Sequence, residues 1–106
     1  MAKYLIQATY SAEGFKGVAK DKASGRKAAL EKALASVGAK LDAIYYAFGD
    51  CDVVLIVDAP DNATVASFGM AACSTGLART STIPLLTVDE ADQAVKKGIT
   101  YRGPGQ

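Results

Sequence analysis

YYAFGDCDVVLIVDAPD, residues 45–61, carries the strongest structural signal in this chain. Its apolar run at 53–58 has no polar residue in either alternate set before Asp58, which predicts a strand covered on both faces. The short segment 49–51 connects this strand to the one before it. The two strands are therefore expected to be antiparallel neighbours, because parallel neighbours need a crossover of a dozen or more residues.

Two further strands are predicted upstream. Residues 39–48 form the strand before the tight connection, with Tyr46 on one face and Tyr45 on the other. Residues 3–10 alternate between apolar and more polar positions and form the first strand.

Residues 11–38 have helical periodicity and link those two strands. Ser11 is a candidate N-cap, and Gly38 is expected to end the helix. The Ser24 and Gly25 pair makes two helical pieces, or one kinked helix, the expected form.

Downstream, Pro60 and Asp61 are typical of a helix start. Residues 79–86 form a fourth strand, which Pro84 assigns to a sheet edge or a bulge because proline cannot donate to a ladder. Residues 87–98 then begin with the spacing of a capping box and predict a short helix.

This order of elements predicts an α+β fold of the ferredoxin-like βαββαβ type with an extra C-terminal helix. Four antiparallel strands are covered on one side by two helices. Residues 1–98 are expected to form a single domain, and residues 99–106 a Gly/Pro-rich tail.

The second face of such a sheet also needs cover, because its central strands are apolar on both faces. The economical cover is the sheet of a second copy, which predicts a homodimer or a higher homo-oligomer with a cavity between sheet and helices. The alternative is a monomer whose last helix folds across the open face.

Composition excludes several kinds of chemistry. The 106-residue chain has no His, so Ser-His-Asp and Cys-His nucleophile systems are absent. Its formal charge of +1 gives no indication of the basic surface that binding to nucleic acid or to an anionic membrane requires. With no long apolar segment, a cytoplasmic protein is expected, in which Cys51 and Cys73 are reduced thiols. No motif calls for a metal or a cofactor.

The stretch YYAFGDCDVVLIVDAPD, preceded by VGAKLDAIYY and followed by GLARTSTIPLL, resembles the small bacterial GYD-domain family. The resemblance covers about residues 3–87 and implies a dimeric α/β barrel fold without an assigned activity. The Gly-Tyr-Asp motif of the family falls on Gly49, Cys51 and Asp52, with Cys51 where tyrosine is usual. The matching positions are Gly49, Asp52, Pro60 and Asp61.

Arg26 is the first ligand-binding candidate, because it belongs to the inward stripe predicted for the 11–38 helix. The other members of that stripe are Phe15, Leu30, Ala33 and Val37. A guanidinium there could hold a carboxylate or Asp52. The alternative is an arginine whose stem packs while its head reaches water.

The remaining candidates are Tyr45, Tyr46, Asp52 and Arg79. The tyrosines offer hydroxyls inside a cavity, or else fill a core or interface. Asp52 lies at the rim of the core, where desolvation raises a carboxyl pKa, or else shapes its turn by accepting backbone N–H groups. Arg79 has the simplest role as a rim ion pair.

These patterns favour a homodimer that binds a small aromatic or carboxylate molecule in its cavity. One alternative is a cofactor-independent isomerase or monooxygenase with Tyr45 or Tyr46 as acid, Arg26 as anchor and Asp52 as base. The other is a pure assembly module whose apolar face is all interface. A cavity filled by side chains would favour the assembly module.

Overall fold

The computed structural model describes all residues from 1 to 106. The elements in chain order are β1 (Ala2–Tyr10), α1 (Ala12–Ala35), β2 (Lys40–Tyr46), β3 (Val53–Ala59), α2 (Asn62–Ser74), β4 (Ala78–Leu85) and α3 (Val88–Lys96). No helix has the length and apolar character needed to cross a membrane.

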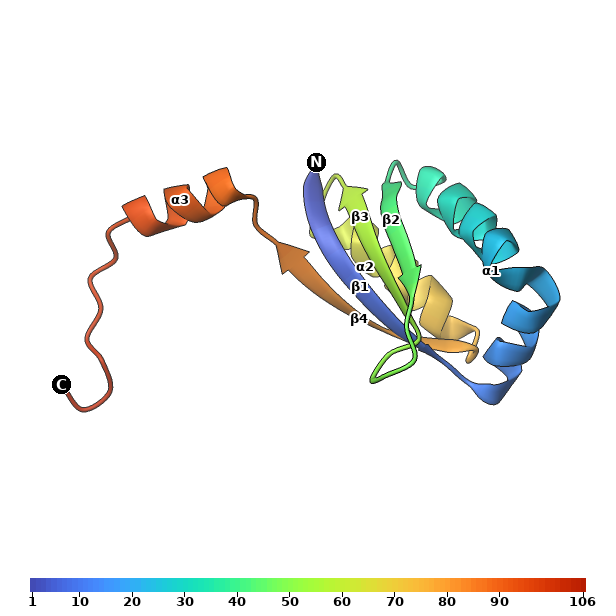
Figure 1. Ribbon diagram of the computed structural model, residues 1–106. Helices are drawn as coiled ribbons and strands as arrows, with labels where there is room; N and C mark the ends of the chain where they lie inside the picture. The colour runs from blue at the N-terminus through green and yellow to red at the C-terminus, as the bar shows by residue number, and fades with distance from the viewer.

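The sheet has the strand order β2-β3-β1-β4, and all three neighbouring pairs are antiparallel. This order confirms the ferredoxin-like α+β prediction. Both long helices lie on the same side of the sheet, and α3 extends away from the body beyond the end of β4 (Figure 1).

The core lies between the sheet and the two helices. Alternation places Tyr4, Ile6 and Ala8 of β1 on this side, where Ile6 pairs with Leu55 of β3. The helices add Leu34, Val65 and Phe68. Tyr4 also donates a hydrogen bond from its hydroxyl to Asn62 Oδ1 at 2.6 Å, which fixes the start of α2 against β1.

Helix α1 begins at its predicted cap, since the Ser11 hydroxyl accepts from Gly14 N at 3.1 Å. Its predicted kink is present but lies at Lys22, where φ is 63° and ψ is 165°. The predicted inward stripe is partly wrong, because after the kink the inward positions run every four residues through Arg26, Leu30 and Leu34. Leu34 is buried and Leu30 is half-buried, whereas Phe15, Ala33 and Val37 are exposed.

Strand β2 is shorter than predicted and contains a register shift between Leu41 and Ala43. It ends at Tyr46, so the connection to β3 spans residues 47–52 instead of a three-residue turn. Phe48, expected on the strand, is fully exposed in this loop.

The other predicted boundaries agree with the structure within two residues. Asp61 caps α2, β4 is an edge strand that tolerates Pro84, and α3 begins with the capping box of Thr87 and Glu90.

The opposite face of the sheet is uncovered. One apolar row crosses all four strands through Ile83, Leu5, Ile56 and Ala43, which are paired in register. A charged row lies beside it, where Lys3 Nζ contacts Asp58 Oδ1 at 2.7 Å and Asp42 Oδ2 at 3.3 Å. Helix α3 does not cover this face, contrary to the monomer alternative considered from the sequence.

Candidate functional site

A cavity lies between the helices and the core face of the sheet, in two parts that share Tyr10, Arg26, Ala72 and Ala78. The outer part has a volume of about 240 Å³. Its other lining residues are Gly14, Gly17, Val18, Asp21, Thr75 and Leu77. The inner part, of about 50 Å³, reaches apolar core side chains. These are Ile6, Ala8, Leu30, Val53, Leu55 and Phe68, with Thr80 as the remaining lining residue.

Small residues keep this space open. Ala72 of α2 and Ala78 of β4 stand where longer side chains would fill the cavity. Gly14 lets α1 approach the turn before β4, because a Cβ there would overlap the Leu77 carbonyl oxygen. That oxygen accepts a hydrogen bond from Ser11 N at 2.9 Å, which holds the start of α1 against the turn.

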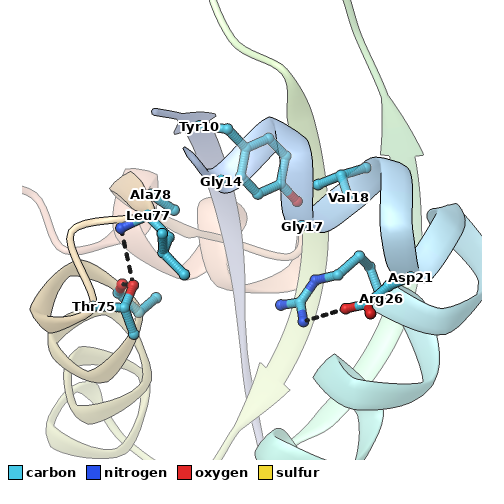
Figure 2. A pocket seen from close by; sticks show the side chains of 10 residues that line it. Tyr10, Gly14, Gly17, Val18, Asp21, Arg26, Thr75, Leu77 and Ala78 are labelled. Carbon is cyan, nitrogen blue, oxygen red and sulfur yellow. Dashed lines mark hydrogen bonds and ion pairs between the residues drawn. The ribbon is translucent and has the colours of Figure 1, made fainter. Parts of the chain in front are cut away.

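Arg26 enters the cavity from the part of α1 that follows the kink. Its Nη1 lies 3.7 Å from Asp21 Oδ2, and its side chain is 31% exposed. Figure 2 shows the guanidinium and the Tyr10 hydroxyl directed into the same space. The structure therefore places Arg26 at the cavity with Asp21 as its partner, and Asp52, the partner considered from the sequence, is not in contact with it.

Two phenols lie near each other, of which only Tyr10 lines the cavity. Tyr10 lines it, and its ring packs edge-on against Phe15 with centroids 5.4 Å apart. Tyr46 lies on the same side of the sheet as the core. Burial raises the pKa of Tyr46 to about 12, with a further rise from the Tyr10 phenol and an opposing effect of the Arg26 charge. Tyr46 is therefore protonated at neutral pH and can donate a hydrogen bond.

Asp52 has a structural role in this arrangement. Its Oδ2 accepts a hydrogen bond from Tyr10 N at 2.8 Å, and its own backbone N–H donates to Ala8 O at 2.8 Å. It does not line the cavity. The carboxylate accepts a backbone N–H as the turn interpretation expects, but the partner is on β1 and not within the hairpin. Asp52 thus fixes the end of β1, from which Tyr10 projects.

Tyr45 and Arg79 lie on the opposite face of the sheet from Tyr46. Tyr45 is 71% exposed. Arg79 makes no ion pair and borders a separate depression of about 180 Å³ that also includes Asp50 and Cys51. Of the five candidates from the sequence, only Arg26 lines the cavity. Tyr46 lies on the core side of the sheet outside that lining, Tyr45 and Arg79 lie on the open face, and Asp52 lies between strands.

The residues in the 47–52 loop and at the start of α2 have local roles. Gly49 is exposed in the 47–52 loop. Asp61 Oδ1 accepts from Thr64 N at 2.8 Å and from Thr64 Oγ1 at 2.7 Å, and these bonds lower the pKa of the Asp61 carboxyl. Pro60 precedes this cap.

Comparison with models of known protein families gives a match for this chain. The GYD domain matches residues 4–95 of the 106 residues. The chain belongs to the GYD-domain family. A search of curated proteins and a search of solved structures each found no match.

In this GYD domain, the turn that carries Gly49, Cys51 and Asp52 is outside the cavity lining. Cys51 and Cys73 are both free and half-buried. Sequence reasoning missed Asp21, Gly14 and Thr75 as lining residues. The signal that could have found them is the pair of glycines at Gly14 and Gly17, one helical turn apart on the side of α1 that lines the cavity.

Proposed function

We propose that this GYD-domain protein binds a small molecule in the cavity between its helices and its sheet, and that it does so as a homodimer. The observation that carries the proposal is Arg26, a half-buried cation aimed into an open cavity whose inner part is apolar. A cavity that side chains do not fill also favours ligand binding over a pure assembly module.

The lining indicates the chemistry of the ligand. Ile6, Leu55 and Phe68 suit an apolar or aromatic body, and Arg26 suits a carboxylate. The outer volume of about 240 Å³ is below the usual range of about 300 to 1,000 Å³ for drug-sized ligands, so the ligand is a small one. A small aromatic acid has both features.

The dimer part of the proposal depends on the open face of the sheet. The row of Ile83, Leu5, Ile56 and Ala43 has no cover within the chain, and face-to-face packing of two copies would bury it. Free cysteines at 51 and 73 accord with a reducing compartment such as the cytoplasm.

The enzymatic alternative, an isomerase or monooxygenase, requires a base at the cavity. Asp21 is the only carboxylate that lines it, and Tyr46, whose raised pKa disfavours its use as a base, lies outside the lining. Asp21 held by Arg26 would be the base in that case. Consumption of a bound ligand, followed by mass spectrometry, would favour this alternative.

The binding test is calorimetry with benzoate and phenylacetate, with benzamide as the neutral counterpart of benzoate. We expect Arg26→Gln to weaken benzoate binding by roughly tenfold to a hundredfold and benzamide binding by much less, because only the carboxylate loses a charge-assisted bond. Arg79→Gln removes the same charge outside the cavity and is the matched control. Equal losses in both variants, or no binding of either acid to the parent protein, would contradict the proposal.

A further inference from the structure

The C-terminal arm, residues 86–101, does not pack against the rest of the chain. It leaves the body at the end of β4, and Figure 1 shows it running away from the sheet. No residue of α3 is buried. The large apolar side chains of the arm are all strongly exposed: Leu86 66%, Val88 80%, Val95 82%, Ile99 84% and Tyr101 74%.

The helix in this arm, α3, nevertheless has the local interactions that stabilise a helix. Thr87 and Glu90 form a complete capping box, with Glu90 N donating to Thr87 Oγ1 at 3.1 Å and Thr87 N donating to Glu90 Oε1 at 3.0 Å. Lys96 in the last turn suits the helix dipole. Val88, Ala91 and Val95 share one face of this helix, and Gln93 lies opposite. The arm therefore carries a formed amphipathic helix with an unpartnered apolar face.

The radius of gyration and the accessible surface of the chain are both larger than those of a compact monomer of the same size. The Cα radius of gyration is 16.8 Å, against about 13 Å for a compact domain of this length. The accessible surface is 7374 Å², against about 5,600 Å² for a compact monomer of 11.0 kDa. The excess per chain is of the order that each subunit buries in an obligate dimer.

The local backbone directs the arm away from its own sheet face. Thr87 has φ −70° and ψ 164°, which is extended, so the chain does not reverse between β4 and α3. Apolar residues also follow one another along the chain from the open face into the arm: Ile83 and Leu85 lie on the open face of β4, and the exposed Leu86 and Val88 come next. A second copy seated on the open face would lie beside the base of the arm.

We infer that the C-terminal arms are exchanged: the apolar face of α3 in each copy docks on the other copy of the dimer. Two-fold symmetry then gives each copy one arm to donate and one to receive. Both unpartnered apolar surfaces of the chain, the open sheet face and the arm, are covered by the same association. This inference rests on the dimer of the proposed function and not on the ligand cavity.

The first experiment removes the apolar face of α3 without weakening the helix. Val88→Glu adds a negative charge in the first turn and Val95→Lys adds a positive charge in the last turn, so both suit the helix dipole and the net charge is unchanged. The eleven core residues all lie between Tyr4 and Phe68, so the body should fold in this double variant. Circular dichroism on urea unfolding checks that it does.

Sedimentation velocity of the full-length chain measures the result. We expect the parent protein to sediment as a dimer and V88E/V95K to raise the dissociation constant by at least about a hundredfold, since four valines are uncovered per dimer. Gln93→Lys, on the opposite face of α3, should leave the constant unchanged. A folded double variant that dimerises like the parent would overturn the inference.

The second experiment identifies which copy the arm touches. A photo-crosslinking phenylalanine analogue replaces Tyr101, and light and heavy isotope-labelled chains are mixed before irradiation. We expect cross-linked peptides that join light to heavy chains. A dimer whose cross-links stay within one chain, or in which the analogue forms none, would overturn arm exchange and leave the proposed dimer standing. A parent protein that is monomeric throughout would overturn both.

Discussion

Tyr45 and Tyr46 are adjacent in the chain and lie in opposite environments. Strand alternation places Tyr46 against the helix side of the sheet, whereas Tyr45 lies on the open face and is 71% exposed. Tyr46 is 40% exposed, and this partial burial raises its pKa to about 12. One position in the sequence therefore separates a partly buried phenol on the helix side from an exposed phenol on the open face.

The raised pKa of Tyr46 makes a prediction about alkaline pH. Below its ordinary pKa of 10.0 the phenol is protonated in both states, and the contribution to stability is fully present. Between pH 10 and about 12 the unfolded chain loses this proton first, so the free energy of unfolding falls as pH rises. Ultraviolet titration should show a late phenol, one that ionises near pH 12. Tyr46→Phe should remove it and flatten this decline, whereas Tyr45→Phe should do neither; a late phenol that survives Tyr46→Phe contradicts the assignment.

At Gly14, the absence of a Cβ allows the start of α1 to pack against the turn before β4. A Cβ at Gly14 would overlap the Leu77 carbonyl oxygen, whereas a Cβ at Gly17 would meet nothing within 4 Å. Gly14→Ala should lower the free energy of unfolding by about 1 to 3 kcal/mol, because the start of α1 must move. Gly17→Ala should raise it by up to about 1 kcal/mol through helix propensity. Urea unfolding measures both, and equal effects of the two substitutions would refute this account of Gly14.

Among the elements, α1 determines most of the geometry of the site. Its kink at Lys22 separates the segment that packs on the turn before β4 from the segment that directs Arg26 into the cavity. The backbone of Lys22, with φ 63° and ψ 165°, is in a region that favours glycine strongly. This strain occurs one residue from Asp21, the partner of Arg26.

Replacing Lys22 by glycine should therefore stabilise the protein. Relief of about 1 to 3 kcal/mol of strain outweighs the entropy that a glycine adds to the unfolded chain, so we expect a gain of about 1 kcal/mol in the free energy of unfolding. Lys20→Gly, in the regular part of α1, should instead cost about 1 kcal/mol. Thermal and urea unfolding of the two variants give the comparison, and a loss of stability in both would show that the kink is not strained.

The element order, the strand neighbours and the three helix caps were predictable because each depends on local signals: alternation, turn residues and capping spacings. The inward stripe of α1 was predicted only in part. A non-glycine residue, Lys22, carries the kink, and after it small or apolar residues occur at both three- and four-residue spacings, so the sequence did not select Leu34 over Ala33. Arg26 was predicted to face inward, yet its partner Asp21 depends on that same kink. Strand alternation correctly placed Tyr45 and Tyr46 on opposite faces of the sheet. The hydrogen bond from Tyr10 N to Asp52 was not predictable, because it depends on how two segments distant in sequence pack together.

For the whole molecule, the apolar half of the sequence is divided between a small core and two unpartnered surfaces. Only 13 of the 106 residues are buried, and all the large side chains among them lie between the sheet, α1 and α2. Many of the other apolar residues lie in the row through Leu5 and Ile56 or on the exposed face of the arm, and the rest are scattered singly, such as Phe15, Phe48 and Met70. A chain with so little buried surface is expected to gain a large part of its stability from association.

Association on the open face predicts that stability depends on protein concentration. Because dimerisation stabilises the folded chain by mass action, each tenfold increase in concentration above the dissociation constant adds about 1.4 kcal/mol per mole of dimer, so the melting temperature should rise by a few degrees. Ile83→Lys places a charge in the apolar row of the exposed edge strand and should lower the melting temperature and abolish its dependence on concentration. Thr82→Lys adds the same charge at an exposed position on the other face of β4 and should keep that dependence. A melting temperature that is constant across a hundredfold dilution of the parent protein would mean that the body is stable alone, and the open face would then need a different occupant.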